Sequence, residues 1–285
     1  MIDTAGIYTL PMGDYLADPC PEPSFSTSVA HALLTQSPLH AWMQHPRLNP
    51  GRVREESSAM DVGTVAHSIL LEGHMDNIAI VEAPDWRTKD AKAARDAARL
   101  QGKTPILAHK VSEIVAMVRA AQEAIHESEL ASSWKEARSE QTVIWQEGET
   151  WCKSRPDRLT KDHRVIIDLK TTAGSAEPNT WLRSGLIQNG YTLQAALYLR
   201  GVKKVCHPKD CTFVFLVVEV EPPYACSFIS MSPQFLAYAD RQLDRALQLW
   251  GDCLLMNIWP GYPSKIAYVD APSYLLMQEE EHEPR

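Results

Sequence analysis

The sequence lacks a long apolar run, an N-terminal leader and any pair of cysteines at metal-binding spacing. Its apolar stretches fall short of the roughly 18 residues that a membrane-spanning helix needs. Residues 1–15 do not place a basic region before an apolar one, as a signal peptide does. Six cysteines are scattered along the chain, and no two are separated by two residues. We therefore expect a cytoplasmic protein without membrane contact, whose reduced thiols hold neither zinc nor an iron–sulfur cluster.

Positive charge is also scarce. The 28 Lys and Arg residues are outnumbered by 36 Asp and Glu residues, which gives a net charge of −8. This balance excludes a protein that coats nucleic acid through a uniformly basic surface. It does not exclude a nucleic-acid enzyme, because clustered carboxylates can bind a metal and a local basic groove can exist on an acidic protein. Residues that could line such a groove are Arg47, Arg52, Arg54, Arg155 and Arg183.

The chain divides into an extended lead-in over residues 1–23, one domain over 24–262 and a tail over 263–285 that ends in acidic residues. Apolar residues at helical and at alternating spacings predict the elements of the domain. Helices are expected over residues 29–34, 39–45, 60–72, 88–99, 108–129, 178–199 with a break at 185–190, and 232–256. Strands are expected over residues 78–81, 141–145, 151–159, 164–171, 211–220 and 225–231. This order predicts an α/β (α+β) fold in which helices flank one mixed central sheet, after an N-terminal helical segment.

Two acidic residues and a lysine gather at the central strands. Side chains alternate between the two faces of a strand, so Asp168 and Lys170 point the same way, with Leu169 behind them. Asp157 follows a proline at the end of the preceding strand, at hairpin distance. Two carboxylates and one lysine would therefore meet at one strand edge.

This set of groups suits phosphodiester hydrolysis. Carboxylate oxygens bind Mg²⁺ or Mn²⁺ and leave coordination positions for water and phosphate, and a nearby lysine can orient the water or stabilise developing charge. The pattern D-x-K alone is common and usually marks a surface ion pair. Here an apolar strand leads up to Asp168 and a second acid precedes it, and both features favour a catalytic site.

Four motifs in order resemble the RecE-like exonucleases (exonuclease VIII), a branch of the PD-(D/E)xK superfamily. They are G-T-V-A-H over residues 63–67, R-P-D over 155–157, D-L-K over 168–170 and Q-A-A-L-Y over 194–198. The segment from Ser28 to Ser37-Pro38 resembles the N-terminal helices of the same group. The resemblance extends over most of residues 24–262, and it implies a PD-(D/E)xK restriction-endonuclease-like core at about residues 134–256.

The resemblance implies a role for each matching residue. Asp157 and Asp168 would bind the metal with the Leu169 carbonyl and His67, although a lone helical histidine is more often structural. Lys170 would be the catalytic lysine. Gln194 and Tyr198 lie on one helix face and would brace the site or touch DNA, and simple helix packing is the alternative for both.

Three further assignments leave alternatives open. An upstream acid is expected, and Glu140 is favoured slightly over Glu72. Arg155 and Thr171 flank the carboxylates and would contact phosphate, but Arg155 could equally pair with an acid of the sheet. A 5′ end would lie near Ser28 and Ser37, where helix N-termini offer N–H groups to a phosphate.

The resemblance implies a 5′→3′ exonuclease that acts on double-stranded DNA ends and exposes 3′ single strands for recombination. It also implies a homo-oligomeric ring and a single-strand annealing protein as partner. Alternatives are an endonuclease or a single-strand-specific nuclease on the same core, and a catalytically silent DNA-binding module. The presence of Asp157, Asp168 and Lys170 together argues against a silent module, because sequence drift usually removes a ligand.

Overall fold

The computed structural model describes residues 1–52 and 58–273. Arg54 and the acidic end of the predicted tail lie outside this range. The helices are α1 (Met12–Leu16), α2 (Thr27–Thr35), α3 (Pro38–Gln44), α4 (Ser58–His67), α5 (Lys89–Leu100), α6 (Ala108–Glu127), α7 (Ala131–Glu136), α8 (Pro178–Trp181), α9 (Tyr191–Cys206) and α10 (Pro233–Met256), with π-helical turns η1 (Ser68–Glu72) and η2 (Leu182–Ile187). The strands are β1 (Gly6–Thr9), β2 (Ile78–Val81), β3 (Thr104–Leu107), β4 (Arg138–Ser139), β5 (Gln141–Glu147), β6 (Thr150–Ser154), β7 (Arg158–Leu159), β8 (Val165–Thr172), β9 (Thr212–Glu219) and β10 (Cys226–Ile229).

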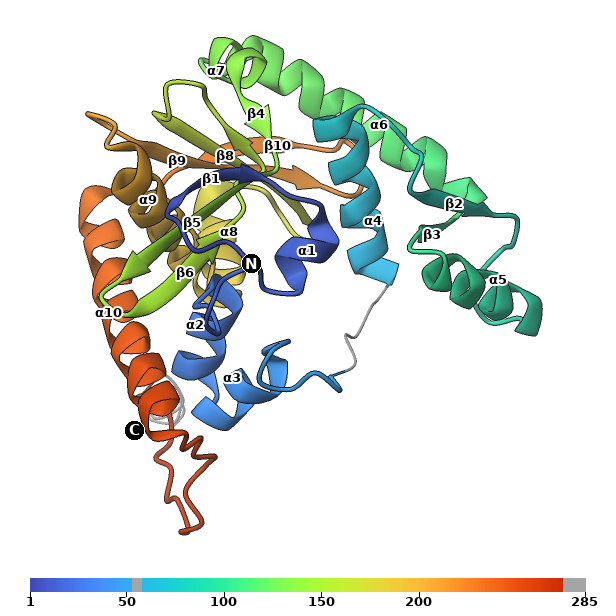
Figure 1. Ribbon diagram of the computed structural model, residues 1–285. Coiled ribbons are helices and arrows are strands. Elements are labelled where there is room, and N and C mark those ends of the chain that lie inside the picture. Colours follow the sequence, from blue (N-terminus) through green and yellow to red (C-terminus); the bar gives the residue numbers. More distant parts are fainter. Residues whose placement is uncertain (53–57, 274–285) are drawn as a thin grey trace, which may run out of the picture.

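The fold is mixed α/β, as predicted, but its strands do not form a single sheet. In the described parts of the chain they form a mixed five-stranded sheet in the order β10-β9-β8-β7-β4, an antiparallel sheet β1-β5-β6 and a parallel pair β2-β3. The parallel pair β8–β9 forms the centre of the larger sheet, and α9 lies on the crossover between them. Figure 1 shows α9 and α10 on one side of the sheets and α4 and α6 on the other. None of the described helices is long and apolar enough to cross a membrane.

A bend in one long hairpin divides the predicted sheet. The register that pairs Val143 with Ser154 also pairs Ser139 with Arg158, and in that register Glu140 stands opposite Asp157. The Glu140 N–H donates to the Asp157 carbonyl at 3.0 Å, although Glu140 adopts a positive φ of 56°. Pro156 has no N–H to continue the ladder. The predicted strand over 151–159 is therefore two strands, β6 and β7, which lie in different sheets.

The two faces of the central sheet enclose separate cores. Ile166, Phe213 and Phe215 face the core shared with α2, α9 and α10, whereas Ile167 and Leu216 face the core shared with α4 and α6. The alternation is the one predicted from the sequence of β8. It turns Asp168 and Lys170 towards α9.

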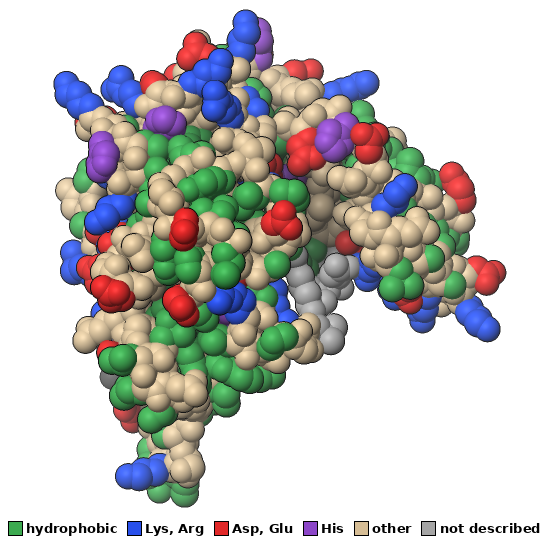
Figure 2. All heavy atoms as spheres, viewed as in Figure 1, with side chains coloured by type: hydrophobic (Ala, Val, Ile, Leu, Met, Phe, Trp, Pro, Cys, Tyr) green, Lys and Arg blue, Asp and Glu red, His purple; other side chains and the backbone are tan. Residues whose placement is uncertain are grey.

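Helix α10 begins where the sequence predicts. The Ser232 hydroxyl accepts from the Phe235 N–H at 3.2 Å, and Pro233 occupies the first helical position. Residues Ile78–Val81, predicted as a strand, form β2 and pair in parallel with β3 beside α5. These three elements lie at one edge of the molecule in Figure 1, where β2 and β3 pack against α4 and α6, and the surface beside them is hollowed in Figure 2.

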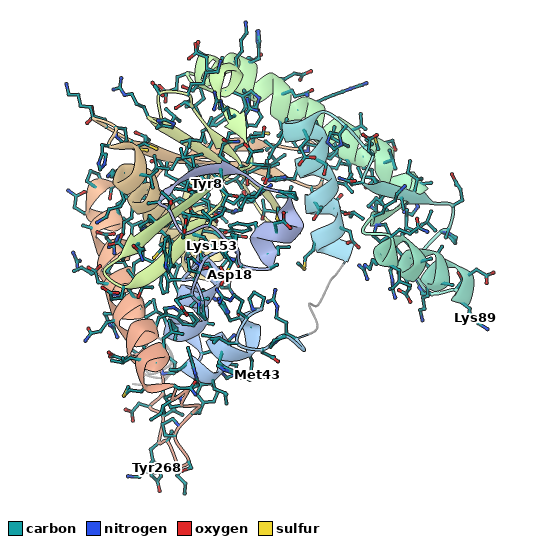
Figure 3. The ribbon with its side chains drawn as sticks, viewed as in Figure 1. Tyr8, Asp18, Met43, Lys89, Lys153 and Tyr268 are labelled. Atoms are coloured by element: carbon teal, nitrogen blue, oxygen red, sulfur yellow. The ribbon has the colours of Figure 1, made fainter. Side chains whose placement is uncertain are left out.

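The lead-in over residues 1–23 is not merely extended. It contains β1, which pairs with β5, and the short helix α1. Asp18, fully buried, ties the segment down: it accepts from the Ser24 N–H at 3.0 Å and lies 3.3 Å from His45 Nε2 and 3.4 Å from Lys153 Nζ. Figure 3 shows Asp18 and Lys153 close together. A four-residue strand whose partner lies more than 100 residues away leaves little local pattern, which is why sequence periodicity missed it.

Replacing Asp18 tests how firmly this segment is anchored. Asp18→Asn leaves the Lys153 ammonium buried without its carboxylate, so we expect the free energy of unfolding at pH 7 to fall by about 3–5 kcal/mol. Burial alone would raise the pKa of Asp18, but His45, Lys153 and Ser24 outweigh it and hold the pKa below its usual value. The stabilisation is therefore present above about pH 4 and is lost as the pH falls through the lower folded pKa.

Urea unfolding from pH 3 to pH 8 measures both effects. The difference between wild type and Asp18→Asn should stay constant above about pH 4 and narrow only below it. Asp14→Asn is the matched control, because Asp14 is exposed in the same segment and should change stability by less than about 0.5 kcal/mol. Equal stability of the two variants would contradict the anchoring role.

Candidate active site

The bend of the hairpin brings two carboxylates and a histidine together. Glu140 and Asp157 face each other across the bend, and α4 places His67 between them. His67 Nε2 lies 3.0 Å from Asp157 Oδ1, and His67 Nδ1 lies 3.3 Å from Glu140 Oε1. One ligand atom from each of the three residues falls within 4.8 Å of the others. The three side chains are only partly exposed, at 25%, 12% and 13% for His67, Glu140 and Asp157.

Asp168 and Lys170 lie alongside this cluster on β8. Gln194 Nε2 donates to Asp168 Oδ1 at 2.7 Å, and the Lys170 ammonium bonds to the other carboxylate oxygen. The Asp168 side chain is 1% exposed. Lys170 Nζ also lies 4.7 Å from the centre of the Tyr191 ring, a cation–π distance. Tyr191 escaped the sequence analysis, because only its position one turn before Gln194 could have pointed to it.

The backbone of Leu169 joins β8 to Asp157. The Leu169 N–H donates to Asp157 Oδ2 at 2.7 Å. Continuing the β7–β8 register by two residues places Leu169 opposite Pro156, which has no N–H to donate to the Leu169 carbonyl. The same proline that ends the ladder thus frees a carbonyl oxygen at the site.

Burial and charge shift the pKa values of the cluster in opposite directions. Burial raises the pKa of Asp168, and the charge of Asp157 raises it further. Burial would also raise the pKa of Asp157, but the charge and hydrogen bond of His67 hold it below its usual value. Burial lowers the pKa of His67, and the Asp157 carboxylate more than compensates, so that the pKa rises to about 9. With their pKa values raised, His67 and Lys170 are positively charged and balance the charge of the carboxylates.

The cluster offers the donors that a divalent cation needs. Three carboxylates, one imidazole and one backbone carbonyl are hard oxygen and borderline nitrogen ligands, which suit Mg²⁺ or Mn²⁺. The residues that would hold the ion are Asp157, Asp168 and His67, with the Leu169 carbonyl and Glu140 beside them.

The glycine of the upstream motif has a packing role, since a Cβ on Gly63 would lie 3.2 Å from Thr171 Oγ1. Because Gly63 has no side chain, α4 can lie close to β8.

Several predicted residues lie elsewhere. Glu72 pairs with His74 at 3.0 Å near the surface and does not join the cluster. Thr171 faces α4, on the opposite side of β8 from Asp168. Arg155 pairs with Glu140, the alternative that the sequence had left open. Ser37 Oγ bonds to His40 Nδ1 at 2.6 Å.

Ser28 and Tyr198 line a cavity next to the cluster. The cavity has a volume of about 220 Å³, and its lining also includes Lys153 and Arg52. Tyr198 lies one helical turn from Gln194, which bonds to Asp168. The Thr27 hydroxyl, also on the lining, is buried without a hydrogen-bond partner among the described residues. The Arg183 side chain is exposed on η2, and Arg47 donates to the Cys20 and Pro21 carbonyls.

Comparisons with known proteins show the family and the fold. The family model of a "PDDEXK-like domain of unknown function (DUF3799)" matches residues 26–272. The structure is similar to that of a candidate exonuclease from Eubacterium rectale, with 13% identity, a TM-score of 0.55 and coverage of 90% of this chain and 97% of that one. An alkaline exonuclease (LHK-Exo) from Laribacter hongkongensis gives 16% identity, a TM-score of 0.26 and coverage of 70% and 96%. No curated protein matches the chain. At such identity the first similarity shows a shared fold, and the second carries no further argument.

The choice between the two upstream acids predicts a difference in metal affinity. Glu140→Gln removes a charge beside His67 and Asp157, so we expect Mn²⁺ affinity to fall about 10-fold or more, the scale of losing a group that supports a metal ligand. Glu72→Gln is the matched control and should leave the affinity unchanged. Isothermal titration of Mn²⁺ into DNA-free protein measures both, and an equal loss in the two variants would contradict the assignment of Glu140.

Proposed function

The chain belongs to the family of PDDEXK-like domains described as DUF3799 and has the PD-(D/E)xK nuclease fold, and on this premise we propose that it is a divalent-metal-dependent deoxyribonuclease that degrades double-stranded DNA from 5′ ends. The observation that carries the proposal is the convergence of Glu140, Asp157, Asp168 and Lys170 on one bend of the sheet, with His67 between two of the acids. The 5′→3′ direction, the exposure of 3′ strands for recombination, a homo-oligomeric ring and an annealing partner rest on the resemblance to RecE-like exonucleases.

A bound divalent ion would polarise the scissile phosphoryl group and lower the pKa of a bound water. The residues around it have separate tasks. Asp157 and Asp168 would hold the ion, and Gln194 fixes the Asp168 carboxylate by its 2.7 Å hydrogen bond. Burial lowers the pKa of Lys170, but the carboxylates of Asp168 and Asp157 raise it by more, so the half-buried ammonium beside the reacting centre keeps its charge. Such a cation stabilises negative charge that develops on the phosphate.

The cavity beside Tyr198 supports recognition of a terminal phosphate. Ser28 lies in the first turn of α2, where backbone N–H groups favour an anion. Arg52 and Lys153 also line the cavity, and the Lys153 ammonium is paired with Asp18. Tyr15 and Tyr198 also line this cavity, and Tyr198 lies one helical turn from Gln194, which bonds to Asp168. A 5′ phosphate held here would present a nearby phosphodiester bond to the metal site.

The requirement for a free end is tested with matched DNA substrates. Linear duplex should be degraded in Mg²⁺ or Mn²⁺, whereas covalently closed circles of the same sequence should survive. Asp168→Asn should abolish degradation of the linear duplex, because it removes the charge of a metal ligand but keeps nearly the same volume. Metal-dependent cutting of closed circles by the wild type would instead support an endonuclease, and full activity of Asp168→Asn would contradict the assigned site.

The terminal-phosphate cavity predicts a preference between DNA ends. Hydrogen bonds to a charged group contribute about 1.5–3 kcal/mol, so duplexes with 5′-phosphoryl ends should be degraded at least about 10-fold faster than duplexes with 5′-hydroxyl ends. Ser28→Ala should reduce this ratio. Ser37→Ala is the matched control, since Ser37 bonds to His40 and should leave the ratio unchanged. Equal rates for the two ends in the wild type would remove the cavity from the proposal.

A further inference from the structure

Arg155 is held by several contacts with protein groups. Its side chain is 9% exposed. Nε donates to Glu140 Oε2, and one terminal nitrogen donates to the Leu10 carbonyl at 2.8 Å and to Thr142 Oγ1 at 3.1 Å. The guanidinium carbon also lies 5.7 Å from the centre of the Tyr15 ring. The planar donor fork is therefore already engaged by protein acceptors on several sides.

The Glu140 carboxylate connects this arginine to the metal cluster. One of its oxygens accepts from Arg155, and the other lies 3.3 Å from His67 Nδ1. Arg155 therefore fixes how the carboxylate is turned towards the cluster. Glu140 itself has a positive φ at the bend, so its side chain departs from the regular alternation of the strand.

Two of the contacts of Arg155 come from the N-terminal segment, residues 6–20. This segment precedes the region that the family model matches, which begins at residue 26. It is bound to the sheet by β1 and to Lys153 through the Tyr15 carbonyl at 2.7 Å and through Asp18. Leu10 follows directly after β1, so the pairing of β1 with β5 sets the position of the carbonyl that Arg155 binds.

We infer that Arg155 is a positioning residue for the metal cluster, acting through Glu140, and that the N-terminal segment is part of the active site because it holds Arg155 in place. The inference rests on the proposed metal-dependent function. A guanidinium is required because it bonds to Glu140 and Leu10 at once in a fixed geometry, which the single ammonium of a lysine cannot reproduce. Arg155 does not contact the DNA backbone.

A double-mutant cycle on Mn²⁺ affinity tests this coupling without using catalysis. Mn²⁺ is titrated calorimetrically into DNA-free wild type, Arg155→Gln, Glu140→Gln and the double variant. Arg155→Gln should weaken Mn²⁺ binding about 10-fold, and it should have almost no further effect when Glu140→Gln is already present, because it acts through Glu140. Arg155→Lys should restore little of the loss and serves if the glutamine variant does not fold.

Two further measurements separate the possible roles. Tyr15→Leu, which removes the aromatic face beneath Arg155 but keeps apolar bulk, should weaken Mn²⁺ binding several-fold. Arg164→Gln is the control, since Arg164 is exposed and pairs with Asp210 at 3.7 Å. Binding of duplex DNA in Ca²⁺, which is followed by fluorescence anisotropy at several salt concentrations, should change less than about 2-fold in Arg155→Gln.

Several results would overturn the inference. Additive losses in the double variant would mean that Arg155 acts independently of Glu140. Unchanged Mn²⁺ affinity with weaker DNA binding and a salt dependence reduced by about one charge would make Arg155 a phosphate contact. If Arg155→Gln weakened Mn²⁺ binding and Tyr15→Leu did not, the N-terminal segment would not be part of the site. A wild type that neither binds Mn²⁺ nor cleaves DNA would contradict the proposed function itself.

Discussion

The hydrogen bond from the Glu140 N–H to the Asp157 carbonyl holds the bend on which the site depends. On one side of the bend, β5 and β6 belong to the three-stranded sheet, and on the other side β4 and β7 belong to the five-stranded sheet. Pro156 interrupts the hydrogen-bond ladder between the two parts because it has no N–H. The bend sets the Glu140 and Asp157 carboxylates opposite each other. Because Pro156 has no N–H, it donates no hydrogen bond to the Leu169 carbonyl. Strand β8 then adds Asp168 and Lys170, and α4 adds His67. The candidate active site therefore lies where the hairpin stops being one strand pair and its two halves enter different sheets.

Such a concentration of buried acids costs free energy unless positive charge compensates it. The protein supplies that charge from three directions: His67 from α4, Lys170 from β8, and Arg155 from the bend. Burial raises the pKa of Glu140, while His67 and Arg155 act against the shift. The cations hold the carboxylates in place, and a divalent metal would take over much of this role.

The sequence predicted most of the long elements and the central constellation, because both leave local signals. Alternation along the predicted strand over residues 164–171 indicated that Asp168 and Lys170 share a face, and Ser232-Pro233 predicted the start of α10. The pairing of β1 with β5 could not be predicted, because a strand of four residues has no measurable period and its partner is remote. The choice between Glu72 and Glu140, and between the two interpretations of Arg155, also needed tertiary structure. Both depend on contacts across the bend, between segments that no local pattern connects.

Metal binding at this bend is the central claim, and anomalous scattering from crystals grown with Mn²⁺ tests it most directly. The account predicts a strong Mn²⁺ peak within about 2–2.5 Å of carboxylate oxygens of both Asp157 and Asp168, with His67 or the Leu169 carbonyl completing the ligand set. A well-ordered Mn²⁺ ion at other acids, in a protein that still cleaves DNA, would contradict it.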